Sequence, residues 1–420
     1  MESAICVQCA NDVHLKILIE ENSEELQCSV CGESDSPAIS VTELGKFIEP
    51  ILRQHFQLGP TVRMFGEDDK DWWEQDGEPI SWAVQEVLGQ YFDFEDDIVD
   101  AVVAAEDFWP QDGDEAFWDS TSLYVETRVK VGHYYAQWRH TLEELKHGRR
   151  FFSPAAQALF IKLFSGVEDQ KAWIKDKFEP VVYFLPVHTE LYRARICSSR
   201  SMLRDIMADP FKRVGPPPKE AARAGRMNAE GVPVFYSALD KSTCLAEMRP
   251  ALGNELAVIT VRTTKPLRIL DFSRLEAARG GRTLSYFQPD FTEEVEKGAF
   301  LRRLHSLVSQ PIVPGHEADY LITQTMAEYL AHVHNEPFDG VLFASAQMAE
   351  GRNVVLFAER DLLAASAAEA FRVEYVDGSV GVQTTKTIEY AHEELGVVVG
   401  DDGDVYVHDG TYGEDDDWLD

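Results

Sequence analysis

The chain has 420 residues, of which 45% are apolar and 27% charged, and its formal net charge is −34. This length predicts two or three domains, each able to bury a hydrophobic core. The longest apolar runs have the length of a strand, which is too short for a membrane span. The strong negative charge is the opposite of the basic surface that nucleic-acid binders use. We therefore expect neither a membrane nor a nucleic acid as partner.

The N-terminus, "MESAICVQCA", lacks the basic region followed by an apolar region that marks a secretory signal. The expected compartment is therefore the cytoplasm. Disulfides are disfavoured there, because the cytosol keeps thiols reduced.

Four of the six cysteines form two pairs, Cys6-x2-Cys9 and Cys28-x2-Cys31, separated by 18 residues. This spacing predicts a four-thiolate site for structural Zn²⁺, with an iron–sulfur cluster as the alternative. Four protein ligands leave no open position, so the metal is not expected to be catalytic. Between the pairs, "VHLKILIEENSEELQ" is interpreted as a strand, a turn and a returning strand, and Gly32 suits a tight turn.

After the cysteines, apolar residues recur at helical spacing, as at Leu44, Phe47, Ile48, Ile51 and Leu52. The pattern predicts an α+β chain in four segments. Residues 1–40 form a zinc knuckle, 41–178 an all-helical domain, 179–368 a mixed α/β catalytic domain, and 369–420 short β segments with an acidic tail.

Residues 66–119 contain 19 acidic residues, one basic residue and five of the eight tryptophans. A solvated acidic surface is the interpretation we favour. The alternative is a docking surface for a basic protein partner, with Trp72, Trp73, Trp109 and Trp118 as anchors.

The stretch "VFYSALDKSTCLAEMRP" predicts a strand followed by a short helix capped by Asp240. On that helix Glu247 shares a face with Thr243 and Cys244. A carboxylate that faces a core is costly unless something pairs with it, so Glu247 is a candidate functional residue.

Other polar residues of the mixed region lie where strands end or helices face inward. Arg193 and Arg195 are two residues apart in "LYRARI" and share a side of that strand. Ser345 directly follows the apolar strand "DGVLFA". Further candidates are Tyr192, Arg226, Tyr236 and Gln324.

These residues, in this order, resemble the RES family, named for a shared arginine, glutamate and serine. The resemblance rests on "LYRAR", "GRMNAEGVPVFYSALDKSTCLAEMRP" and "DYLITQTMAEYLAHVHNEPFDGVLFASAQMAEGRNVVLFAE". It makes Arg193, Glu247 and Ser345 the catalytic residues. The family's usual "GGRWN" reads "AGRMN" here, with Met227 in place of the tryptophan.

The resemblance implies a catalytic domain similar to ADP-ribosyltransferase folds, which cleaves the nicotinamide–ribose bond of NAD⁺ and transfers ADP-ribose to phosphate or water. Arg226, Tyr236 and Gln324 match further recurring positions and, with Tyr192, are expected to bind NAD⁺. Such a protein is expected to be a toxin, with an antitoxin as partner, or a defence effector gated by its N-terminal module.

The chemistry agrees with these roles. A carboxylate stabilises the cation that forms on ribose when an N-glycosidic bond breaks, and arginines bind pyrophosphate or phosphate. Structural alternatives are a rim ion pair for Arg193, an ion pair of Glu247 with Arg249 or Arg193, and a simple turn position for Ser345.

The N-terminal part is similar to the helical HEPN-related module that precedes some RES domains. HEPN ribonucleases carry an arginine and a histidine separated by four to six residues, and Arg128 and His133, with four residues between them, fit that spacing. The alternative functions are therefore a HEPN-type ribonuclease, which the acidic charge opposes, and a protein ADP-ribosyltransferase.

Overall fold

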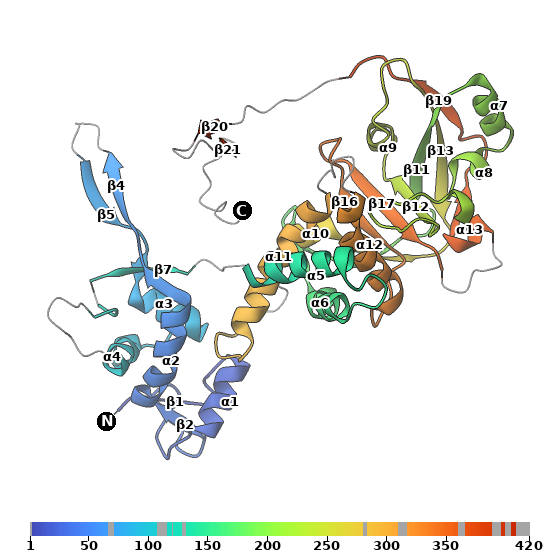
Figure 1. The fold of residues 1–420 in the computed structure, drawn as a ribbon. Coiled ribbons are helices and arrows are strands. Elements are labelled where there is room, and N and C mark those ends of the chain that lie inside the picture. Colours follow the sequence, from blue (N-terminus) through green and yellow to red (C-terminus); the bar gives the residue numbers. More distant parts are fainter. Residues whose placement is uncertain are drawn as a thin grey trace. The chain divides into compact units, whose positions relative to one another are not determined.

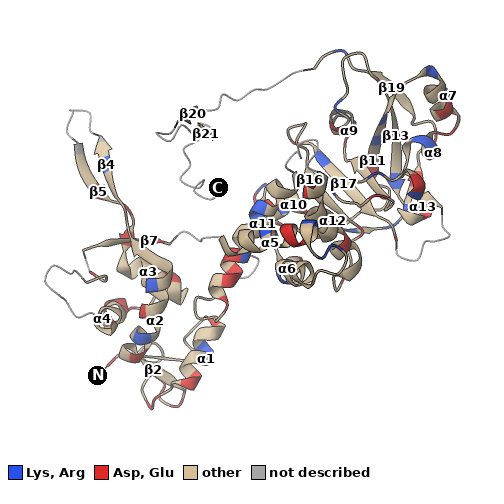
Figure 2. Ribbon diagram, in the orientation of Figure 1, with Lys and Arg blue, Asp and Glu red and all other residues tan. Residues whose placement is uncertain are grey.

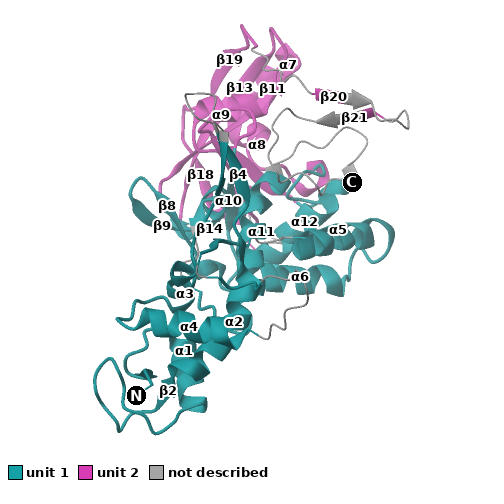
Figure 3. Cartoon of the chain, turned by 90° about the vertical axis from the view of Figure 1, so that its left-hand side faces the viewer, with its two compact units in different colours: residues 1–185, 223–232, 267–344 teal, residues 186–222, 233–266, 345–420 magenta. Residues whose placement is uncertain are grey.

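A computed structural model describes residues 2–65, 71–106, 116–119, 121–127, 132–279, 284–309, 317–359, 366–388, 396–399 and 405–408. Figure 1 labels its helices and strands. The chain forms two compact units (Figure 3). Unit 1 comprises residues 1–185, 223–232 and 267–344, and unit 2 comprises residues 186–222, 233–266 and 345–420. Both contain helices and sheet, which confirms the mixed class expected from the sequence.

The chain begins with a two-stranded sheet in which β1 (Ala4–Cys6) pairs antiparallel with β2 (Ala38–Ser40). The segment between the cysteine pairs contains the helix α1 (Val13–Glu21), so the expected strand, turn and strand are wrong. Asp12 caps this helix by accepting a hydrogen bond from the Leu15 amide at 2.8 Å. Leu15 and Ile19, one helical turn apart, are both buried, which favours the helix over a strand.

Three helices build the core of the N-terminal part: α2 (Val41–His55), α3 (Ile80–Leu88) and α4 (Glu95–Ala105). Their apolar faces meet in one cluster that includes Leu44, Ile48 and Val102. Gly45 lets α2 approach α4 closely, because a Cβ there would lie 2.7 Å from the backbone of Ala101. The helical spacing read from the sequence is confirmed for this face.

Residues 41–178 also contain strands, which corrects the expectation of an all-helical domain. One sheet has the order β3 (Phe56–Leu58), β7 (Leu123–Glu126), β6 (Glu78–Pro79), and a hairpin pairs β4 (Thr61–Phe65) with β5 (Asp71–Gln75). These strands have two to five residues, too few for a clear alternation of apolar and polar residues.

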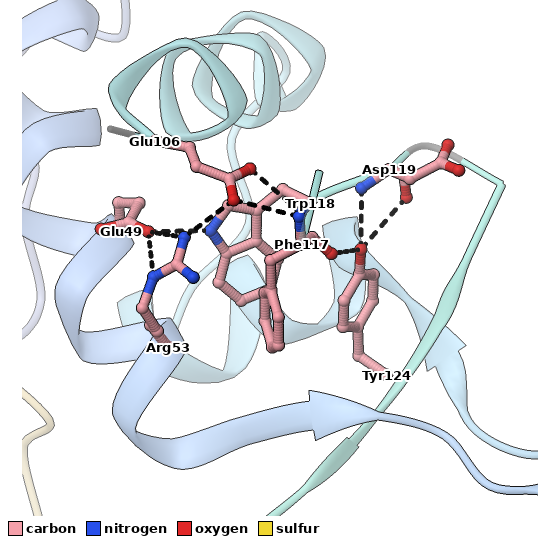
Figure 4. Close-up of polar contacts among 7 residues, drawn as sticks. All are labelled: Glu49, Arg53, Glu106, Phe117, Trp118, Asp119 and Tyr124. Carbon is pink, nitrogen blue, oxygen red and sulfur yellow. Dashed lines mark hydrogen bonds and ion pairs between the residues drawn. The ribbon is translucent and has the colours of Figure 1, made fainter. Parts of the chain in front are cut away.

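A polar cluster joins α2 and α4 to residues 117–119 (Figure 4). Glu49 accepts hydrogen bonds from Trp118 Nε1 at 3.0 Å and from Arg53 Nε at 2.7 Å. Arg53 also donates to Glu106 at 3.0 Å, and Glu106 accepts from the backbone amides of Phe117 and Trp118 at 3.0 and 3.2 Å. Each carboxylate therefore has several donors, which offsets the cost of its burial.

This cluster corrects one of the four proposed docking anchors. Trp118 is 1% exposed and packs into the core, so it is a structural residue. Trp109 lies outside the described residues. Trp72 and Trp73 on β5 are 49% and 67% exposed, so docking through these two side chains stays a prediction.

The rest of unit 1 contains three neighbouring strands. Of these, β10 (Val182–Leu185) pairs antiparallel with β14 (Leu267–Asp271), and β14 pairs parallel with β16 (Gly340–Ala344). A smaller sheet has the order β15 (Ala278–Arg279), β8 (Lys171–Ile174), β9 (Lys177–Pro180).

In the helices of this part of unit 1, Ser153 caps α6, whose first residue is Pro154. The helices are α5 (Gly132–His147), α6 (Pro154–Phe164), η1 (Val167–Asp169), α10 (Phe272–Glu276), α11 (Phe291–Ser309), η3 (Glu317–Asp319), α12 (Tyr320–Glu328) and the π-helical turn η4 (Tyr329–Val333).

Unit 2 is built on an antiparallel sheet with the order β17 (Arg352–Phe357), β12 (Val234–Ala238), β11 (Glu190–Cys197), β13 (Glu255–Thr263). Both β18 (Val373–Tyr375) and β19 (Gly381–Thr384) pair with β13. The other elements are α7 (Arg200–Ala208), α8 (Pro210–Val214), η2 (Lys219–Ala221), α9 (Lys241–Glu247), α13 (Ala367–Ala370), β20 (Gly396–Val399) and β21 (Val405–His408).

The described helices are all too short or too polar to cross a lipid bilayer. The four-segment division expected from the sequence stays a prediction.

The polar cluster predicts a pH-dependent stability. The amides of Phe117 and Trp118, together with Arg53, outweigh burial and hold the pKa of Glu106 below its ordinary value of 4.5. Its stabilising effect is therefore present above pH 4.5 and is lost as the pH falls through the lowered pKa. We expect Glu106→Gln to destabilise the chain at pH 7 and the difference from wild type to narrow towards about pH 3.

Urea unfolding followed by tryptophan fluorescence across this pH range measures the effect. Glu78→Gln, at an exposed carboxylate on β6, is the matched control. A stability difference between Glu106→Gln and wild type that stays constant with pH would contradict the assignment.

Candidate active site

Glu247 is the last residue of α9, and the cap predicted from the sequence is confirmed. Asp240 accepts hydrogen bonds from the Thr243 amide at 2.8 Å and from Thr243 Oγ1 at 2.6 Å. Cys244, on the same helix, is buried against Ala194 and Val258. The apolar face of α9 is thus fixed on the sheet, and this face carries Glu247 to a half-buried position at the helix end.

Two neutral donors hold the Glu247 carboxylate. Ser345 Oγ donates to Oε1 at 2.5 Å, and Asn353 Nδ2 donates to the same oxygen at 2.7 Å. Within the described parts of the chain, no residue pairs with the second oxygen, Oε2. The expected alternative of an ion pair with Arg249 or Arg193 is therefore wrong, and the carboxylate is oriented by two uncharged groups.

Close packing of the loop after Ser345 explains this geometry. The Ser345 amide donates to the Gly351 carbonyl at 2.8 Å, and the pairing of β12 with β17 sets Asn353 opposite Ala238. A Cβ at Gly351 would lie 2.4 Å from Thr243 Oγ1, so only glycine lets the loop approach α9 this closely. Ser345 and Asn353 consequently reach Glu247 from the two ends of one tight loop.

Asn353 is the site residue that the sequence analysis missed. It is the second residue of the strand "RNVVLF", where a polar residue is ordinary, and no spacing links it to Glu247. The sequence signal was an amide residue near the start of an apolar strand. The structure shows that this side chain is buried, and a buried amide needs a hydrogen-bond partner.

Arg193 lies on β11 and contacts backbone carbonyls. Its Nε donates to Val214 at 2.8 Å, its Nη1 donates to Tyr236 at 2.7 Å, and the guanidinium lies 5.5 Å from the centroid of the Phe235 ring. Burial lowers the pKa of Arg193 to about 10, which leaves it charged at neutral pH.

Among the described residues no carboxylate forms an ion pair with Arg193, so the expected rim ion pair is wrong. A buried cation without a counter-ion is costly, and an anionic ligand would lower that cost. The third guanidinium nitrogen, Nη2, has no hydrogen-bond partner in the described structure and is available to such a ligand.

The two tyrosines occupy different positions on the same sheet. Tyr192 donates from its hydroxyl to Glu190 at 3.1 Å, and burial together with this carboxylate raises its pKa. Tyr236 is half-buried on β12, and its carbonyl accepts from Arg193. Their expected contacts with NAD⁺ stay predictions.

Arg226 and Gln324 belong to unit 1 and are linked there through the backbone. Gln324 Nε2 donates to the Gly225 carbonyl at 2.8 Å, and Thr323 Oγ1 donates to the Arg226 carbonyl at 2.7 Å. Helix α12 thus fixes the turn that carries Arg226. Met227, which replaces the expected tryptophan, is buried in the same turn.

The four N-terminal cysteines come together as predicted. The sulfur atoms of Cys6, Cys9, Cys28 and Cys31 all lie within 4.8 Å of one another. The Cys6 amide donates to Cys28 Sγ at 3.4 Å, a contact that stabilises a thiolate, and Gly32 has a φ of +77°, which confirms the tight turn. Four convergent thiolates fit a tetrahedral metal ion such as Zn²⁺.

The arginine of the HEPN-like pair, Arg128, lies outside the described residues. His133 is exposed in the first turn of α5 and hydrogen-bonds to Gln137 at 2.8 Å. The similarity of the N-terminal part to a HEPN-related module stays a prediction.

Comparison with known families finds that the model of the RES domain matches residues 190–376. This region contains Arg193, Glu247, Ser345 and Asn353, and it indicates an NAD⁺-related enzymatic activity at the level of the family. No curated protein and no solved structure matches the chain.

The cysteine cluster predicts a dependence of the N-terminal fold on metal. Cys28→Ser removes one thiolate, so we expect loss of bound zinc and a melting temperature lower by roughly 10 °C, because metal binding contributes to folding free energy. Elemental analysis and thermal unfolding measure the two effects. Cys197→Ser, at a cysteine outside the cluster, is the control, and a zinc content unchanged in Cys28→Ser would exclude this ligand set.

Proposed function

We propose that the chain is an NAD⁺ phosphorylase or glycohydrolase, which cleaves the nicotinamide–ribose bond of NAD⁺ and transfers ADP-ribose to inorganic phosphate or water. The observation that carries this proposal is the geometry of the Glu247 carboxylate. Ser345 and Asn353 hold its Oε1, and its Oε2 has no partner among the described residues. The RES match supports the choice of NAD⁺ as substrate.

In the proposed reaction the C1′–N bond breaks and its electron pair leaves with nicotinamide. Positive charge then develops on the ribose ring, and the fixed carboxylate of Glu247 stabilises it. An oxygen of phosphate or water forms the new bond to C1′, and when water is the acceptor Glu247 takes up the proton that it releases. Because the carboxylate is already oriented, little reorganisation is needed as the charge appears.

Arg193 has the complementary role of binding an anion. Its charge has no described counter-ion, and its remaining donor suits an oxygen of the NAD⁺ diphosphate or of the attacking phosphate. Ser345 acts as an orienting group, because its hydroxyl proton is directed to Glu247. Arg226, Tyr192, Tyr236 and Gln324 are proposed to complete the NAD⁺ site.

The cysteine site would hold Zn²⁺ through Cys6, Cys9, Cys28 and Cys31, and its role is to stabilise the N-terminal fold. An enzyme that consumes NAD⁺ harms its own cell unless it is controlled. We therefore infer a toxin or defence effector that is gated by its N-terminal part, with an antitoxin or a basic protein as the expected partner.

The test is incubation of the purified full-length chain with NAD⁺, with and without phosphate, followed by mass analysis of the products. A glycohydrolase is expected to release nicotinamide and ADP-ribose in both cases. A phosphorylase is expected to release nicotinamide and the 1″-phosphate of ADP-ribose only when phosphate is present. Label attached to protein would instead indicate ADP-ribosyl transfer to protein. A folded, metal-bound chain that releases no nicotinamide would refute the proposal.

Glu247→Gln keeps the shape and the acceptor oxygen but removes the charge. We expect kcat to fall about 100-fold or more, as for other electrostatic groups that act on the transition state. Glu374→Gln, at an exposed position on β18 within the RES match, is the control and should keep the wild-type rate. Wild-type kcat in Glu247→Gln would exclude this carboxylate from the chemistry.

Asn353→Asp places a second carboxylate beside Glu247, where the amide nitrogen now lies 2.7 Å away. Two neighbouring carboxylates retain one shared proton to a higher pH than a single carboxylate does, and this proton reduces the negative charge available at Glu247. We expect kcat at pH 7 to fall about tenfold and the acid limb of the pH–rate profile to move to higher pH.

Rates measured from pH 5 to 9 show both effects. Asn353→Ala, which removes the donor without adding charge, should lower the rate and move the acid limb less than Asn353→Asp does. An acid limb in Asn353→Asp that coincides with wild type would contradict the proposed contact.

A further inference from the structure

His305 on α11 is a buried histidine that contacts the strand leading to Ser345. Its Nε2 lies 3.1 Å from the backbone amide nitrogen of Ala344, the residue that precedes Ser345 in the chain. Its Nδ1 lies 2.9 Å from Oε2 of Glu276, the last residue of α10. The side chain is 8% exposed, so both ring nitrogens depend on these partners.

The chemistry of the partners fixes the protonation of the ring. A backbone amide can only donate, so Nε2 must present its lone pair to Ala344. A carboxylate can only accept, so Nδ1 must carry the proton and donate it to Glu276. The result is a neutral imidazole locked in one tautomer between a carboxylate and an amide.

The contact between His305 and Ala344 lies just beyond the point where the pairing of β16 with β14 ends. The parallel pairing of β14 with β16 ends at Leu342, two residues before Ala344. His305 therefore provides the acceptor for a backbone amide beyond the last pair of that ladder. A shift of this amide is passed directly to Ser345 through one peptide unit.

We propose that His305 is a positioning residue for Ser345, which acts through the backbone of Ala344 and is oriented by Glu276. This inference rests on the NAD⁺-cleaving function proposed above. His305 fixes the backbone at the end of β16 and so fixes the position of Ser345, the next residue. The Ser345 hydroxyl then donates to Glu247 at 2.5 Å. Loss of the imidazole acceptor releases the strand end and weakens the orientation of the Glu247 carboxylate.

The experiment compares His305→Ala with His305→Gln, whose side-chain oxygen can still accept from the Ala344 amide. We expect His305→Ala to exchange the Ala344 amide faster and to lose about tenfold in kcat with little change in KM, as for a missing hydrogen bond of about 1.4 kcal/mol. We expect His305→Gln to restore both quantities. Ser306→Ala, at the exposed neighbouring residue on the same helix, is the control.

Where His305→Ala does not fold, Glu276→Ala carries the test, because this half-exposed carboxylate only fixes the tautomer. Amide exchange is measured without substrate, so it reports the contact separately from catalysis. If the wild type is active and these variants keep its kcat and its Ala344 amide exchange rate, the role of His305 is overturned. The proposed function is not affected by that result. A wild type that releases no nicotinamide would overturn the proposed function, and this role with it.

Discussion

The candidate site depends on one constraint: a carboxylate at the end of a short helix must keep its charge and its direction in a half-buried place. Asp240 caps the start of α9, and Ser345 and Asn353 hold Glu247 at its end. Gly351 is required because the loop between these two donors lies against Thr243. The sheet register, the tight loop and the helix cap together fix the position of one oxygen atom, Oε1 of Glu247.

Helix α11 links the N-terminal core to β16 within unit 1. At its start, Phe291 lies 4.8 Å from the His55 ring, measured between centroids, and Thr292 accepts from Gln54 at 2.9 Å. Near its end, His305 accepts from Ala344. A helix of 19 residues is about 28 Å long, so α11 spans the distance between these two sets of contacts. The N-terminal core and the end of β16 are therefore connected by one helix within unit 1.

The sequence predicts features that depend on local chemistry and misses those that depend on distant contacts. The Asp240 cap, the Cys6 and Cys28 pairs and the periodicity of α2 are local, and the structure confirms them. The helix α1 was missed because an isoleucine-rich run also suits a strand. Asn353 and His305 could not be found, because their partners are 106 and 39 residues away and neither belongs to a recognisable spacing.

Charge distribution favours a small anionic substrate over a polyanion. The chain carries −34 overall, yet Lys and Arg gather on β11, α7 and α8 of unit 2 (Figure 2). A polynucleotide would have to approach through the long-range acidic field, whereas a dinucleotide meets mainly the local groups. Arg193 supplies positive charge without a described counter-ion, and Glu247 supplies an open carboxylate oxygen. NAD⁺ presents the matching pair, a diphosphate and a ribose that becomes cationic as its bond to nicotinamide breaks.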